Sequence, residues 1–182
     1  MKNFLLIPFY FLLTTLTVQA QELQTPAPGK SIVYFMRTSG TGALINFKYF
    51  DGDKYLGKFS GLNYFYYECN PGEHLFWVAA ENRDFIKAEL LEDKVYVIQV
   101  IPTMGAFKAA VKLKAVDKSD LKTMKKVNKL LSKKEPLTLD KAKVNAESAK
   151  LEFFIKNGLE KVERDEQKGK SMKLLESNMY HN

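Results

Sequence analysis

Apolar and polar positions alternate along the first half of the chain and recur at helical spacing along the second half. The clearest alternation runs from Phe107 to Ala115, where lysines occupy most of the positions between apolar side chains. Such alternation is typical of a β-strand with one face in the core and the other in water. Beyond residue 117, apolar side chains recur every three or four positions, as they do on one face of an α-helix. The pattern therefore predicts a β-rich region followed by a helical region.

The β-rich region is divided into short strands by turn-forming residues. Residues 32–36 and 95–101 are apolar on both faces, so we expect these two strands to be central or covered on both sides. Asp51-Gly52 separates two alternating runs, which is a strong hairpin signal. The fold class predicted is mainly β: an antiparallel β-sandwich of about eight strands followed by a C-terminal α-helical extension. The expected strands span residues 31–37, 43–50, 54–60, 63–69, 74–80, 85–91, 94–101 and 106–116.

Two main helices are expected in the second half, and a weaker helical pattern follows over residues 159–168. Ser119 is placed to cap the first, and Thr138 to cap a second one over residues 138–156, with Asn157-Gly158 as its C-terminal cap. Since the connection is short and contains a proline, we expect the helices to pack on each other as a hairpin. The alternative is a helix-mediated oligomer, in which they offer apolar surface to a second chain. The last dozen residues show no clear pattern and are expected to fray.

The N-terminus has the features of a secretory signal peptide. Lys2 precedes ten residues, 4–13, that are apolar apart from one proline and too few to span a bilayer. Val18 and Ala20 precede a predicted cleavage point after Ala20. A retained interfacial helix is the alternative. No cysteine stands at the end of the apolar run, where a lipid would be attached. We therefore expect an exported protein, periplasmic or secreted, that is not lipidated.

The rest of the 182-residue chain contains neither a second long apolar run nor a pair of cysteines. No later apolar run approaches the roughly 18 residues that a membrane span requires, so no transmembrane segment is expected in the mature chain. The single cysteine, Cys69, excludes an intrachain disulfide and is interpreted as a small buried hydrophobic residue. We therefore expect the chain to have four parts: a signal peptide (1–20), an extended leader (21–29), a β-sandwich domain (30–117) and a basic, then mixed-charge, helical extension (118–182).

The net charge of +7 is concentrated in one segment. Acidic and basic side chains balance over residues 21–117 and again over 135–182, whereas residues 118–134 hold seven lysines against one aspartate. One interpretation is a solvated helix face, and another is contact with an anionic envelope surface such as lipid headgroups. Lysine without arginine lacks the bidentate fork that reads bases, so we expect no nucleic-acid partner. The lysines are Lys118, Lys122, Lys125, Lys126, Lys129, Lys133 and Lys134.

Few residues are suited to catalysis or metal binding. Cys69 and His74 flank one turn, and a nucleophile–base pair there would make the chain a hydrolase-like enzyme. The sequence shows no third group to orient such a pair, and carboxylates at turns are explained by hydrogen bonds to the turn backbone. We therefore expect no catalytic residues, no cofactor and no metal. The turn carboxylates are Asp51, Asp53, Glu81 and Asp84.

Four consecutive aromatic residues, Tyr64 to Tyr67, form another candidate feature. In a strand, two of the four rings must face away from the other two. The outward rings, with tyrosines of a neighbouring strand, could form a platform for a sugar or a peptide. We favour their being covered by the C-terminal helices, because an exposed aromatic patch is a liability unless it is used. The candidate platform consists of Tyr49, Tyr55, Tyr64 and Tyr66.

Several short segments of residues 30–117 form a pattern of their own. They are IVYFMR at 32–37, YFDG at 49–52, YLG at 55–57, NYF at 63–65, NPGEH at 70–74 and VYV at 95–97. The Pro-Gly-x-His step is the most specific of them. Together they resemble the DUF2846 family of bacterial envelope proteins of unknown function. The resemblance implies a compact envelope β-sandwich and brings no catalytic residues.

The sequence as a whole thus predicts an exported, non-enzymatic envelope protein. We expect it to be a binding or structural module whose partner is an envelope protein or an anionic envelope surface. Oligomerisation through the C-terminal helices remains open at this point.

Overall fold

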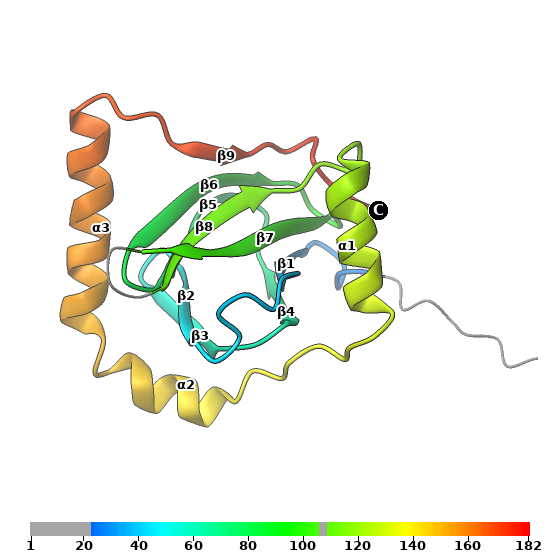
Figure 1. The fold of residues 1–182 in the computed structure, drawn as a ribbon. Helices are drawn as coiled ribbons and strands as arrows, with labels where there is room; N and C mark the ends of the chain where they lie inside the picture. The colour runs from blue at the N-terminus through cyan, green and yellow to red at the C-terminus, as the bar shows by residue number, and fades with distance from the viewer. Residues whose placement is uncertain (1–22, 106–108) are drawn as a thin grey trace, which may run out of the picture.

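The alternating half of the chain folds into two facing β-sheets, with helices on their outer sides (Figure 1). The computed structural model describes residues 23–105 and 109–182. The predicted signal peptide lies outside the described residues, as does the start of the last predicted strand. The mainly β prediction and the helical C-terminal region are both confirmed. In residues 23–105 and 109–182 there are nine strands and three α-helices.

The first sheet has four strands in the order β4-β1-β7-β8, and the second has five in the order β3-β2-β5-β6-β9. The first sheet consists of β1 (Ser31–Arg37), β4 (Asn63–Cys69), β7 (Val95–Met104) and β8 (Ala109–Ala115). The second sheet consists of β2 (Phe47–Asp51), β3 (Lys54–Phe59), β5 (Gly72–Ala79), β6 (Arg83–Leu90) and β9 (Lys173–Leu175).

Both sheets are mixed, so the antiparallel prediction is correct only in part. β1 pairs with β7 in parallel, and β6 pairs with β9 in parallel, while the other pairings are antiparallel. Local hairpins are set by turn residues, and the Asp51-Gly52 turn does join β2 to β3. The parallel pairs join segments far apart in the sequence, and no turn signal marks such partners.

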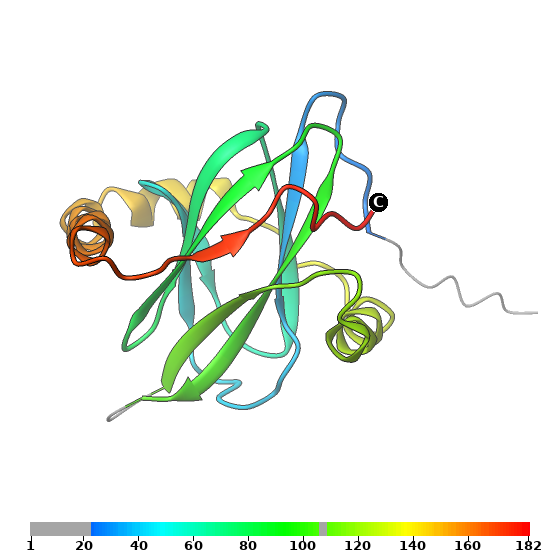
Figure 2. The ribbon, with the colours of Figure 1, turned by 90° about the horizontal axis from the view of Figure 1, so that it is seen from above.

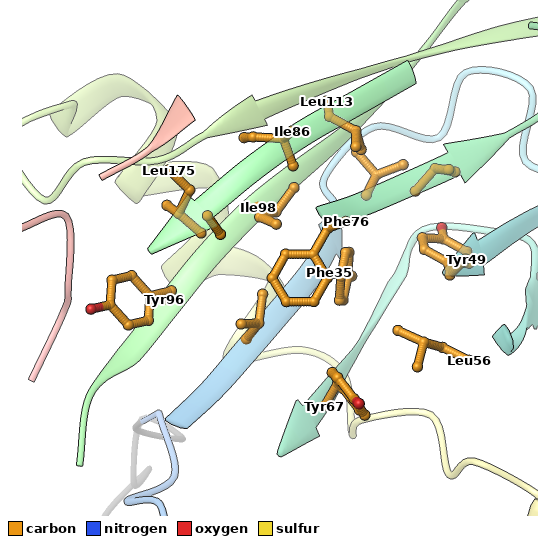
Figure 3. Close-up of a cluster of buried hydrophobic side chains, with 14 of the residues drawn as sticks. Phe35, Tyr49, Leu56, Tyr67, Phe76, Ile86, Tyr96, Ile98, Leu113 and Leu175 are labelled. Atoms are coloured by element: carbon orange, nitrogen blue, oxygen red, sulfur yellow. The ribbon is translucent and has the colours of Figure 1, made fainter. Parts of the chain in front are cut away.

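Aromatic and aliphatic side chains fill the space between the sheets (Figure 3). Phe35 of β1 stacks on Phe65 of β4 with ring centroids 5.0 Å apart, and it meets Phe76 of the second sheet edge-to-face at 5.5 Å. Cys69 is also buried at this core, and its predicted role as a small hydrophobic residue is confirmed. The inner face of each sheet is therefore buried in this core.

The outer faces of the sheets are apolar as well, and the helices cover them. α1 (Leu121–Leu131) buries Val127, Leu130 and Leu131 against the first sheet. α3 (Glu152–Gln167) buries Ile155 and Val162 against the second. The two helices therefore lie on opposite sides of the sandwich (Figure 2). The predicted helical hairpin is wrong, because each helix contributes its apolar side to a different sheet.

The helix boundaries also differ from the prediction. α1 is capped by Asp120 rather than Ser119, through a hydrogen bond from the backbone N–H of Thr123. α2 (Lys141–Ser148) is capped by Asp140 rather than Thr138, and it ends before α3 begins. The predicted single helix over 138–156 is thus broken, since the chain turns from the edge at β3 onto the outer face of the second sheet (Figure 1).

Gly158 lies inside α3 and is not the C-terminal cap that the sequence predicts. It faces Trp77 of β5, and a Cβ atom at Gly158 would lie 2.8 Å from the indole ring. The glycine is therefore required by the close approach of α3 to the sheet.

The last dozen residues do not fray as predicted. Residues 173–175 form β9 at the edge of the second sheet, and Leu175 is buried in the core between the sheets. Farther on, the backbone N–H of His181 donates to the carbonyl of Val95, and the side-chain amide of Asn182 donates to the carbonyl of Asp93. A strand of three residues is too short to show a hydrophobic period, so the sequence pattern could not reveal it.

Replacement of Leu175 tests whether this C-terminal segment belongs to the core. Leu175→Ala should lower the free energy of unfolding by about 2–4 kcal/mol, because it leaves a cavity between the sheets. Leu174→Ala, at a side chain that is 56% exposed, should change it by less than about 0.5 kcal/mol. Urea denaturation of both variants measures the difference, and equal effects would contradict the placement of β9.

Gly158→Ala tests the contact between α3 and Trp77. An added methyl group must displace the indole ring, so we expect a loss of about 1–3 kcal/mol in spite of the better helix propensity of alanine. Gly40→Ala is the control, because a Cβ atom there meets nothing within 4 Å. A Gly158→Ala variant with an unchanged thermal midpoint would show that α3 does not lie this close to the sheet.

Candidate functional site

His74 and Cys69 flank a corner of the sandwich and not a hairpin. β4 belongs to the first sheet and β5 to the second, so Asn70 and Pro71 carry the chain from one sheet to the other. Asp51, at the end of β2, lies beside His74 and provides the third group that the sequence did not reveal. Asp51 and His74 both lie in short segments that stand out in the sequence, at 49–52 and 70–74.

The imidazole of His74 is held on both of its nitrogen atoms. Nδ1 lies 2.9 and 3.0 Å from the two carboxylate oxygens of Asp51, and Nε2 lies 2.9 Å from the backbone carbonyl oxygen of Asn70. The ring also stacks on Phe76, with ring centroids 5.2 Å apart. The hydrogen bond to Asp51 is the main reason that the pKa of His74 is raised to about 10, and hydrogen bonding to Cys69 contributes next.

A protonated His74 cannot serve as a general base at neutral pH. Both of its N–H groups donate, one to a carboxylate and the other to a carbonyl, which leaves no lone pair for a substrate proton. The Cys69 sulfur is buried and lies 3.8 Å from the carbonyl oxygen of Ser31. The contacts of His74 with Asp51 and Asn70 are those of an ion pair that holds the corner together.

The cleft beside this corner has a volume of about 480 Å³, and its polar groups already have partners. The ammonium of Lys54 lies 3.0 Å from the hydroxyl of Tyr67, and the ammonium of Lys30 lies 2.6 Å from the side-chain oxygen of Asn70. Each of these ammonium groups therefore has one partner within the chain and keeps further N–H groups.

The turn carboxylates do not gather into a site. Asp51 pairs with His74, whereas Asp84 accepts hydrogen bonds from the backbone of Leu113 and from Lys173. Among residues 23–105 and 109–182, no group of three or more His, Cys, Asp or Glu side chains is arranged to hold a metal ion.

The four tyrosines of the candidate platform do not share one surface, and the favoured alternative, cover by the C-terminal region, agrees with the contacts of Tyr55 and Tyr64. Tyr49 is buried between the sheets. The hydroxyl of Tyr55 donates to Glu147 of α2 at 2.6 Å, on the outer side of the second sheet. Tyr64, on the outer side of the first sheet, donates to the carbonyl of Lys134 at 3.1 Å, while Tyr66 is partly buried beside Tyr34. The sequence could not assign neighbouring strands to different sheets.

Four of the seven predicted lysines lie on the exposed side of α1, away from the side that packs on the first sheet. Unlike Lys87, which lies 2.6 Å from Glu166, the four lysines within α1 have no ion-pair partner among the described residues. Lys118 lies before the helix with its ammonium 4.9 Å from the ring centroid of Tyr180, and Lys133 and Lys134 follow the helix in exposed positions. We call the four helix residues, Lys122, Lys125, Lys126 and Lys129, the lysine face.

No protein family, curated protein or solved structure matches this chain. Within the part of the chain that the structure describes, no helix is both long enough and apolar enough to cross a membrane.

Asp51→Asn tests the ion pair at the corner. His74 titrated by NMR should show a pKa of about 10 in the native chain, and this value should fall toward the ordinary 6.5 or below in the variant. Asp53→Asn, in the same turn but exposed, is the control and should leave His74 unchanged.

The same pair makes stability depend on pH in a defined direction. Because the pKa of His74 is raised in the folded state, the ion pair contributes its full stabilisation below the unfolded pKa of 6.5. This contribution to the free energy of unfolding is lost as the pH rises through about 10. The advantage of the native chain over Asp51→Asn should therefore shrink across that window when urea midpoints are compared. An advantage that grows with rising pH would contradict the assignment.

Proposed function

We propose that the mature chain is an exported, non-enzymatic envelope protein that binds an anionic envelope surface through the lysine face of α1. The observation that supports this most directly is a set of four lysines on one exposed side of a single helix, none of which has a carboxylate partner in the part of the chain that the structure describes. The opposite side of that helix is fixed on the first sheet by Val127, Leu130 and Leu131. The charges are therefore presented by a rigid support.

The size of the effect is sufficient for reversible attachment. Each lysine close to an anionic lipid surface contributes about 1 kcal/mol, so the four residues of the lysine face together supply several kcal/mol. At physiological salt this attraction decays over about 8 Å, so only close contact counts. Leu121, 78% exposed, is the only large apolar side chain exposed on α1. We therefore expect electrostatic attachment without deep insertion.

The non-enzymatic part of the proposal is supported by the chemistry of the corner. His74 is the histidine that the sequence places near a nucleophile, and its two N–H groups are engaged by Asp51 and Asn70. An oligomeric scaffold built on the helices is less well supported, because the apolar sides of α1 and α3 are used within the chain.

Membership in the DUF2846 family and export to the envelope remain parts of this proposal. What supports the relation is that the resembling segments correspond to structural units of the sandwich: β1, the β2–β3 hairpin and the corner at His74. Export rests on the predicted signal peptide, which lies outside the described residues.

Binding to vesicles tests the proposal. The processed chain should bind vesicles that contain phosphatidylglycerol at low salt and dissociate as salt is raised. Replacing all four residues of the lysine face by glutamine should weaken binding by at least about tenfold.

The control for this experiment replaces four exposed lysines on α2, on α3 and between them, away from α1, and it should have little effect. They are Lys141, Lys143, Lys150 and Lys156. Absence of binding at low salt, or equal loss in both variants, would refute attachment through α1.

A further inference from the structure

A cleft opens where the first turns of α1 cross the outer face of the first sheet. Its volume is about 380 Å³. Gln99 of β7 and Lys114 of β8 form part of it, and they are directly opposite each other in the sheet. Lys122 and Lys126, one helical turn apart on α1, line the other side. The cleft thus joins one end of the lysine face to the sheet beneath it.

The base of the cleft is polar in an otherwise apolar strand. Gln99 is only 7% exposed, and its side-chain amide donates to the hydroxyl oxygen of Thr38 at 2.7 Å. Because that oxygen accepts, the hydroxyl hydrogen of Thr38 is free to donate elsewhere. The Gln99 amide also has a second N–H, and neither hydrogen has an acceptor among the described residues. Gln99 is therefore satisfied through one N–H and keeps a second N–H next to the Thr38 hydroxyl, so two donors at the base of the cleft are available to a ligand.

The charge of the cleft is positive. Lys114, Lys122 and Lys126 line it, and Asp120 is the only acidic residue among the described lining residues. The carboxylate of Asp120 is already engaged by the ammonium of Lys114 at 2.5 Å and by the backbone N–H of Thr123 at 3.0 Å. It therefore leaves the charges of Lys122 and Lys126 unneutralised.

We propose that this cleft binds one phosphate group. Its donors come from three sides: Thr38 and Gln99 at the base, the N–H groups of Lys114 that Asp120 does not engage, and Lys122 and Lys126 on the helix. A phosphate monoester offers three acceptor oxygens and a charge between −1.5 and −2, which matches this arrangement better than a planar carboxylate with two oxygens. Lysine ammonium groups are common phosphate ligands as point charges.

The phosphate site depends on the proposed function in one respect only, which is the kind of molecule that carries the phosphate group. If α1 lies against an anionic membrane, the group is the headgroup of a lipid with a terminal phosphate. A soluble phosphate ester has the same chemistry and would use the same donors. The experiment therefore needs a soluble probe and a vesicle probe.

The soluble probe is inorganic phosphate, titrated into the processed chain by calorimetry at low ionic strength. Lys122→Gln/Lys126→Gln should weaken binding by about tenfold or more, since each removes a charge-assisted contact. Lys125→Gln/Lys129→Gln is the matched control, with the same spacing, helix and charge change outside the cleft, and should alter affinity by no more than about twofold. The side-chain amide signal of Gln99 should shift in NMR spectra during the titration. No binding to the native chain, an unmoved Gln99 signal, or equal loss in both variants would overturn the site.

The vesicle probe compares phosphatidic acid, which has a terminal phosphate, with phosphatidylglycerol at equal surface charge. A preference for phosphatidic acid that disappears in Lys122→Gln/Lys126→Gln identifies a lipid as the source. Phosphate binding without that preference supports the cleft and assigns it to a soluble phosphate ester. If the chain binds phosphate but no vesicle of either kind, the proposed function is refuted and the phosphate site in the cleft is still supported.

Discussion

Both sheets of this protein carry large apolar side chains on both faces, and this constraint sets the positions of the helices. The inner faces meet in the core around Phe35 and Phe76, but the outer faces still carry Tyr34 on one sheet and Trp77 on the other. An exposed sheet face of this kind would be open to aggregation. The C-terminal half removes that exposure by placing α1 on one side and α3 on the other. Gly158 shows how close the cover is, since α3 reaches Trp77 without room for a methyl group.

The same constraint places the candidate functional surface. Because the apolar side of α1 is held by the first sheet, its lysines must point to solvent, and they do so from a fixed position. α1 covers the sheet around Tyr34 and Val97 but leaves Gln99 at the edge of its cover, where β7 changes from apolar to polar. The cleft therefore results from where the helix starts, and Asp120 fixes that start as the N-terminal cap. Surface charge and cleft are two consequences of one packing arrangement.

Local patterns in the sequence predicted local features, and features that depend on distant pairing could not be predicted. The alternation of lysines with Val111 and Leu113 indicated β8, and Asp51-Gly52 indicated the β2–β3 turn. The parallel pairing of β1 with β7 and the short β9 leave no local signature. The four candidate tyrosines belong to different sheets, and no local pattern could show that. For the site, the charge count found the lysine face. The sequence analysis did not predict a role for Gln99, although an amide side chain within the otherwise apolar run 95–101 indicates a polar site on that strand.

The rigidity of the support explains how a modest number of lysines can suffice. An isolated helix of 11 residues is marginal in water, so α1 owes its structure to the burial of Val127, Leu130 and Leu131 and not to its own propensity. A disordered basic segment would lose conformational entropy on binding an anionic surface, and that loss would offset part of the electrostatic gain. Here the ordering has already occurred during folding. The energy from each lysine is then available for binding, and the spacing of Lys122 and Lys126 at the cleft is set before any ligand arrives.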